Sequence, residues 1–171
     1  LRAQLDSGDT VYILSGTYNA FNGVNTKTDA AFKNGAGVGT KEMTIQAYDP
    51  ANPPNLNMPA ATNPYFIYTS QQGTYTFKHI NFTNTGDLQF RALVAGMGAT
   101  IRLEDCTQDF QSSWNQIHGT NLDGYFDLHR CWLKNQYGSG ITNAFVFDTN
   151  VFGGLSMFAC KTTGIPTLYH M

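Results

Sequence analysis

From residue 65 onward, short runs of alternating apolar and polar residues are separated by Gly, Asn and Asp. This pattern is typical of β-strands joined by tight turns. Residues 10–14 and 43–48 alternate in the same way. Residues 50–64 hold five of the six prolines, and we expect an irregular excursion there, because proline cannot donate a hydrogen bond to a sheet ladder. The pattern therefore predicts an all-β protein.

One hydrophobic motif recurs along the chain: two apolar residues at alternate positions, followed three residues later by a small or apolar residue. It starts at Tyr75, Ile101, Phe126 and Phe145, and a weaker copy starts at Leu155. The first three steps are 26, 25 and 19 residues, about the length of one coil of a β-solenoid. The last step of 10 residues is too short for a coil. The final copy is therefore either a second strand within one coil or the end of the pattern.

Three cysteines occupy the same position of this motif, namely Cys106, Cys131 and Cys160. Stacked coils would place them above one another as an internal column of small apolar side chains. A disulfide between neighbours is a second interpretation, and metal binding or catalysis is a third. An antiparallel β-sandwich, the alternative fold, would not explain why the cysteines share one repeat position.

The segment LDSGDTVYILSGTY (residues 5–18) resembles the opening of right-handed parallel β-helix proteins of the pectate-lyase-like superfamily. MTIQA (residues 43–47) is similar to the second strand of that opening, and the closest resemblance is to the chondroitinase B and alginate lyase type. The resemblance implies a right-handed parallel β-helix of about five to seven coils. Residues 1–5 would form a short N-terminal cap. Residues 1–171 would be a single β-helix domain, whole or a fragment of a longer chain.

The charge of the chain narrows its partners. Charged residues make up 13% of the sequence and the net charge is −2, so no basic stripe is available for nucleic acid. No apolar run reaches the roughly 18 residues of a membrane span. Low charge, abundant Asn and Thr, and one sequon at residues 81–83 indicate an extracellular or cell-surface protein.

The outward positions of the repeated strand form three columns that hold most of the charge after residue 70. The columns are Thr76, Arg102, Asp127, Val146; Lys78, Glu104, His129, Asp148; and His79, Asp105, Arg130, Thr149. In the lyases that the chain resembles, this strand face binds and cuts polysaccharide. The resemblance therefore implies a polysaccharide ligand on these columns.

Cleavage of a uronate polysaccharide by β-elimination needs a cation to neutralise the sugar carboxylate, a base for the adjacent proton and an acid for the leaving oxygen. Arg102 or Arg130 could neutralise the carboxylate, and Lys78 or His129 could be the base. Ca²⁺ is a possible cofactor in place of the arginine, with oxygen ligands from acidic residues. The metal candidates are Glu104, Asp105 and Asp148, and the candidates for sugar contact are Asp127 and Trp132. In a glycoside hydrolase, two of the carboxylates would act instead.

A structural interpretation of the columns stays open, because opposite charges on neighbouring strands stabilise one another without any ligand. The chain would then be a non-enzymatic solenoid, such as part of a surface adhesin, a fibre or a phage tail protein. The lack of a match to the lyases' catalytic Lys and Arg motif favours this class. Open strand edges at the ends of such a solenoid would permit end-to-end or lateral self-assembly.

Overall fold

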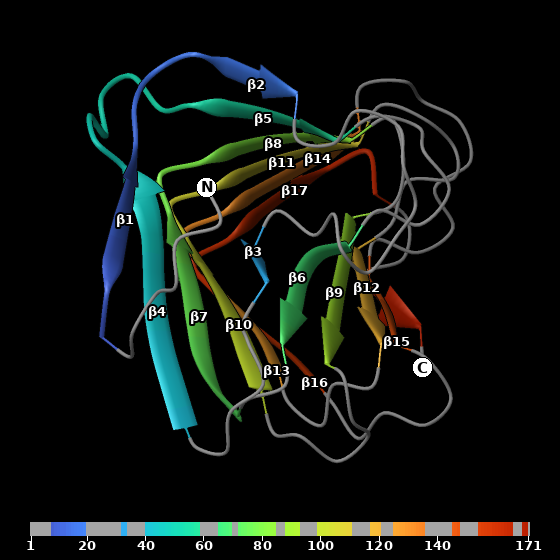
Figure 1. Cartoon of the computed structure of the whole chain (residues 1–171). Coiled ribbons are helices and arrows are strands. Elements are labelled where there is room, and N and C mark those ends of the chain that lie inside the picture. Colours follow the sequence, from blue (N-terminus) through green and yellow to red (C-terminus); the bar gives the residue numbers. More distant parts are fainter. Residues whose placement is uncertain are drawn as a thin grey trace.

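In the computed structural model, the described residues are 8–19, 32–33, 40–58, 65–69, 72–84, 88–92, 99–110, 117–120, 125–135, 145–147, 154–165 and 169–170. They form eighteen strands in three six-stranded sheets (Figure 1). Every third strand belongs to the same sheet, so the chain visits sheets A, B and C in turn and then begins the next coil. The repeat of 25 or 26 residues thus corresponds to one coil of three strands.

The sheets are listed here by strand. Sheet A is formed by β1 (Thr10–Ile13), β4 (Thr40–Ala47), β7 (Gln72–Lys78), β10 (Ala99–Glu104), β13 (Tyr125–His129) and β16 (Gly154–Phe158). Sheet B is formed by β2 (Thr17–Asn19), β5 (Asn55–Met58), β8 (Asn81–Asn84), β11 (Thr107–Phe110), β14 (Trp132–Asn135) and β17 (Lys161–Thr163). Sheet C is formed by β3 (Phe32–Lys33), β6 (Tyr65–Thr69), β9 (Leu88–Ala92), β12 (Ile117–Thr120), β15 (Phe145–Phe147) and β18 (Tyr169–His170).

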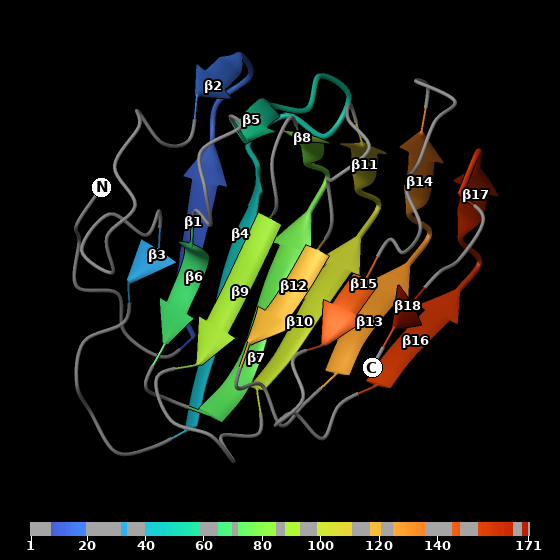
Figure 2. The ribbon, with the colours of Figure 1, turned by 90° about the vertical axis from the view of Figure 1, so that its right-hand side faces the viewer.

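Each pair of neighbouring strands in sheets A, B and C is parallel. Figure 2 shows the coils side by side, with the strands of one sheet running in the same direction. The antiparallel β-sandwich is therefore wrong, and the all-β, parallel arrangement is compatible with a β-helix. The N-terminal cap expected at residues 1–5 lies outside the described residues.

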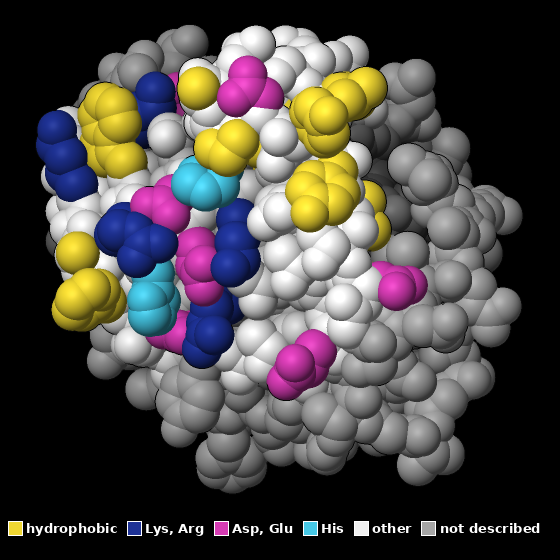
Figure 3. Space-filling view, turned by 90° about the vertical axis from the view of Figure 1, so that its left-hand side faces the viewer, with side chains coloured by type: hydrophobic (Ala, Val, Ile, Leu, Met, Phe, Trp, Pro, Cys, Tyr) yellow, Lys and Arg dark blue, Asp and Glu magenta, His cyan; other side chains and the backbone are white. Residues whose placement is uncertain are grey.

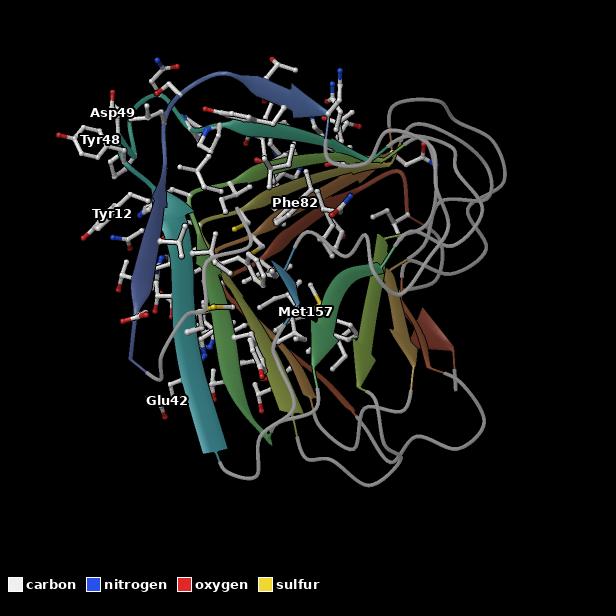
Figure 4. The ribbon with its side chains drawn as sticks, in the orientation of Figure 1. Tyr12, Glu42, Tyr48, Asp49, Phe82 and Met157 are labelled. Atoms are coloured by element: carbon white, nitrogen blue, oxygen red, sulfur yellow. The ribbon has the colours of Figure 1, made fainter. Side chains whose placement is uncertain are left out.

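The core of the described part consists of side chains that point inward from sheets A and B. Alternation along a strand sends every second side chain to the interior. In sheet A, Ile45, Phe77, Leu103 and Leu128 stand in register and are 0–1% exposed. In the stick view, Phe82 of sheet B and Met157 of sheet A point into the interior (Figure 4).

The cysteines lie at the corner where sheet A turns into sheet B, and all three are free thiols. Cys106 and Cys131 are buried and Cys160 is half-buried in the last coil. Their Sγ atoms lie 3.2–3.4 Å from backbone carbonyl oxygens, and Ile80 occupies the same place one coil earlier. Burial raises the pKa of the Cys106 thiol well above its ordinary value. The predicted buried column is confirmed.

Two details of the predicted repeat are wrong. The copy at Phe145 belongs to β15 of sheet C, whereas Leu155 is the residue that pairs with Phe126 in sheet A. The step between these two coils is therefore 29 residues, and the copy at Leu155 is a full member of the repeat. The outward columns accordingly end in Ser156, Phe158 and Ala159 rather than at residues 146, 148 and 149.

The proline-rich segment also departs from expectation, because β5 lies inside residues 50–64. Pro53 and Pro54 come just before this strand, where no N–H is needed for the ladder. The Pro54 carbonyl accepts a hydrogen bond from the N–H of Asn81 in the next coil, at 3.0 Å. Proline here ends the corner and does not interrupt the sheet.

Candidate functional site

Most of the predicted site residues lie together on the outer face of sheet A and at its corner with sheet B. Parallel pairing sets Arg102 opposite Asp127 and sets Glu104 between Lys78 and His129. We call the charged face the set Lys78, Arg102, Glu104, Asp105, Asp127, His129 and Arg130. Figure 3 shows basic, acidic and histidine side chains interleaved on this side of the molecule. The sequence was therefore right about which charges meet, apart from the last coil.

Lys78 and Glu104 form an ion pair between successive coils. The Lys78 Nζ atom lies 2.9 Å from Glu104 Oε2, and the two side chains are 34% and 19% exposed. The pair is the cross-strand contact that the alternating column predicted. It also means that Lys78 and Glu104 neutralise each other on the face.

Asp127 links two other members of the charged face. Arg102 donates from Nε to Asp127 Oδ2 at 2.9 Å, and His129 Nε2 lies 3.0 Å from Asp127 Oδ1. Partial burial raises the pKa of Asp127, but the hydrogen bonds from Arg102 and His129 outweigh it and leave this pKa below its ordinary value. Asp127 is therefore a carboxylate that orients both neighbours.

Arg130 and Asp105 form a two-point ion pair at the corner. Arg130 donates from Nε and Nη2 to the two oxygens of Asp105, both at 2.7 Å. This hydrogen bonding lowers the pKa of Asp105 and raises that of Arg130. The pair joins adjacent coils and fixes the planar guanidinium by two contacts.

Trp132 lies on the outer face of sheet B and is 39% exposed. The ammonium groups of Lys134 and Lys161 lie 5.1 and 4.7 Å from the centre of its ring, within cation–π range. Its indole N–H donates to Thr163 Oγ1 at 3.2 Å. The ring therefore already has partners, and it stands on a different sheet from the charged face.

The expected cation site has little support from the described side chains. Glu104 and Asp105 are each held by a basic residue, and Asp148 lies outside the described residues. Across the part of the chain that the structure describes, no three His, Cys, Asp or Glu side chains gather as metal ligands. These residues as placed do not fit Ca²⁺, and we derive no step through it.

The chemistry open to the charged face centres on His129. With Nε2 turned to Asp127, the carboxylate favours the tautomer that leaves Nδ1 as an acceptor. Such a histidine can take a proton from a ligand. Lys78 and Arg130 are engaged by carboxylates, so they serve better as fixed positive charges.

Three exposed aromatic residues are missing from the predicted site, namely Tyr12, Tyr48 and Phe158. Tyr12 and Phe158 begin and end the outward column that contains Lys78, Glu104 and His129. Phe158 is 64% exposed and its ring centre lies 5.9 Å from that of His129. The alternation of residues 10–14 already placed Tyr12 outward, so this signal was present in the sequence.

Among the residues that could be searched, no helix has the length and apolar character required to cross a membrane. Comparison of the chain with protein-family models, with curated proteins and with solved structures found no match.

Proposed function

We propose that this chain is an extracellular, right-handed parallel β-helix domain of the pectate-lyase-like type that binds a polysaccharide along the outer face of sheet A. One observation carries the proposal, a straight column of outward side chains with aromatic ends and a polar centre. The column is Tyr12, Gln46, Lys78, Glu104, His129 and Phe158.

The spacing of this column suits a polymer with a short repeat. Neighbouring strands lie about 4.8 Å apart, which is close to the length of one sugar unit in an extended chain. Each coil would then meet one sugar, with charged and amide groups for hydroxyls and ring faces for apolar C–H surfaces. Half-exposed side chains held by ion pairs lose little freedom on binding.

Cleavage by β-elimination is a second candidate function, favoured by the contact between Asp127 and His129. His129 Nδ1 would take the proton next to the sugar carboxylate, and Arg102 would balance the charge of that carboxylate. The C–O bond to the leaving sugar then breaks, and its oxygen takes a proton from water. The product carries a new C=C bond.

A purely structural solenoid remains the alternative, favoured by the ion pairs Lys78–Glu104 and Arg130–Asp105, which join adjacent coils. In that case the charges serve only cohesion of the stack. Ligand binding separates the two hypotheses.

The test is binding of soluble neutral and acidic polysaccharides, measured by affinity electrophoresis and calorimetry. We expect Arg102→Gln to weaken binding by about tenfold. Lys134→Gln is the matched control, because it breaks a similar cross-coil ion pair, with Asp109 at 3.1 Å, on sheet B. Absence of binding by the folded protein would leave the structural solenoid. Ultraviolet absorbance of an unsaturated product, lost in His129→Ala, would establish the elimination.

A further inference from the structure

The corner between sheets A and B is enlarged in the second coil. Later coils turn this corner in two residues, whereas seven residues (48–54) separate β4 from β5. The loop is internally bonded: the Ala51 N–H donates to Asp49 Oδ1 at 3.0 Å and the Asn52 N–H to the Asp49 carbonyl at 3.1 Å. Ser15 of the first coil donates to the Asn52 carbonyl at 2.5 Å. The protrusion is thus a built feature of the surface.

This loop brings Tyr48 beside Tyr12, a pair that we call the aromatic corner. The ring centres are 6.2 Å apart and the planes meet at 79°. Tyr12 is 57% and Tyr48 68% exposed, and both point away from the interior (Figure 4). The Tyr48 N–H donates to the Ile13 carbonyl at 2.8 Å, which fixes the base of the side chain. Two nearly perpendicular rings with open faces are therefore held at the surface.

The charges near the aromatic corner define what it could hold. Tyr12 is opposite Gln46 in the sheet A register, and Lys78 comes next, with its ammonium on Glu104. Asp49 follows Tyr48 directly. A carboxylated sugar would meet this acid without a nearby unengaged cation among the described residues. An uncharged sugar can lay its C–H face on a ring and bond its hydroxyls to the Gln46 amide and the tyrosine hydroxyls.

We infer that the aromatic corner is a stacking subsite for an uncharged sugar ring. The inference rests on the proposed function and specifies it: the polysaccharide that crosses the charged face carries a neutral sugar at the second coil. Tyr12 belongs to the same outward column as His129, so one ligand can reach both. The ligand then has chemically different units at its two ends.

The experiment measures affinity for soluble neutral polysaccharides (a mannan, a galactan and a β-glucan) and for polygalacturonate and alginate. Wild type is compared with Tyr48→Ala, Tyr48→Phe and Leu14→Ala. Leu14 is the matched control, an exposed apolar residue of the first coil that is 63% exposed. We expect Tyr48→Ala to weaken binding of a polymer with neutral sugars by about tenfold, as for a central aromatic contact. Tyr48→Phe, which keeps the ring, and Leu14→Ala should bind like wild type.

Each outcome distinguishes this inference from the proposed function. Binding that weakens in Arg102→Gln but not in Tyr48→Ala overturns the subsite and leaves the function standing. Binding of polygalacturonate or alginate alone, with no polymer that contains neutral sugars, also overturns the subsite alone. A folded wild-type protein that binds no polysaccharide overturns both. Thermal unfolding of Tyr48→Ala, whose side chain is largely exposed, checks that the variant is folded.

Discussion

Arg130 and Asp105, one coil apart, form two hydrogen bonds of 2.7 Å while both of their backbones have a φ of 53°. His79 and Ala159 occupy the equivalent place in the neighbouring coils with φ of 53° and 52°. The left-handed conformation therefore belongs to the turn itself, and it costs energy for residues other than Gly, Asn and Asp. The ion pair offsets part of that cost in the two middle coils.

Replacement of Asp105 by Asn should reduce stability at neutral pH but not at low pH. Arg130 lowers the pKa of Asp105 below its ordinary value of 3.8 in the folded protein. Its contribution is thus present above that ordinary value and is lost as the pH falls through the lower folded pKa. The measurement is the free energy of unfolding of wild type and Asp105→Asn between acid and neutral pH.

Asp49→Asn is the control for that pH series. It removes the same charge but keeps an oxygen that can accept the Ala51 N–H. Its stability should follow wild type at all pH values. A gap between wild type and Asp105→Asn that persists at the acid end would contradict the ion pair as the cause.

Replacement of Gln108 by Leu should stabilise the protein. Gln108 is 1% exposed and lies in register between the buried residues Phe82 and Leu133. Among the described residues, neither of its amide atoms has a hydrogen-bond partner. A buried amide without a partner costs about 1–3 kcal/mol, so Leu of similar size should raise the free energy of unfolding by about 1 kcal/mol or more.

Chemical denaturation of the purified variant measures this gain. Gln108→Ala is the companion change, since it also removes the amide but leaves a cavity, and it should be less stable than Gln108→Leu. If Gln108→Leu unfolds more easily than wild type, the amide has a stabilising partner and the interpretation is wrong.

The fold could be predicted from the sequence because one physical constraint, the alternation of apolar residues at coil spacing, acts on every coil. The same pattern misplaced Phe145, since β15 of sheet C also alternates and apolar spacing carries no label for the sheet. Asp148 was assigned to the charged face through that misalignment. The register of Leu155 with Phe126 depends on three-dimensional pairing that a weak motif could not supply.

The candidate site was predicted in its membership but only partly in its contacts. Stacking of columns was sufficient to anticipate Lys78 with Glu104 and Arg130 with Asp105. His129, however, contacts Asp127 on its own strand rather than Glu104, a choice set by side-chain direction and not by column. The aromatic corner escaped prediction because the length of an inserted loop does not reveal that it returns Tyr48 to Tyr12.

Thiol reactivity should rank the cysteines by their place in the column. Cys160 is half-buried in the last coil, whereas Cys106 and Cys131 are buried, and access and thiolate fraction control alkylation. Iodoacetamide should therefore label Cys160 first in the native protein, as read by mass spectrometry of the peptides. In denaturant all three should react at similar rates. Preferential native labelling of Cys106 would contradict the buried column.

Gly164 is the position where a single methyl group should do the most local damage. Its φ is +70°, and an added Cβ would lie 2.6 Å from the carbonyl oxygen of Asn135 in the preceding coil. Gly8 has a φ of +91° and nothing within 4 Å of such a Cβ, so Gly8→Ala carries the conformational cost alone. Gly8→Ala should lower the free energy of unfolding by about 1 kcal/mol, and Gly164→Ala should lower it further. The difference between the two variants measures the clash between the last coil and the coil before it. Equal losses would show that the last coil moves away to admit the methyl group, and that its packing on Asn135 contributes little to stability.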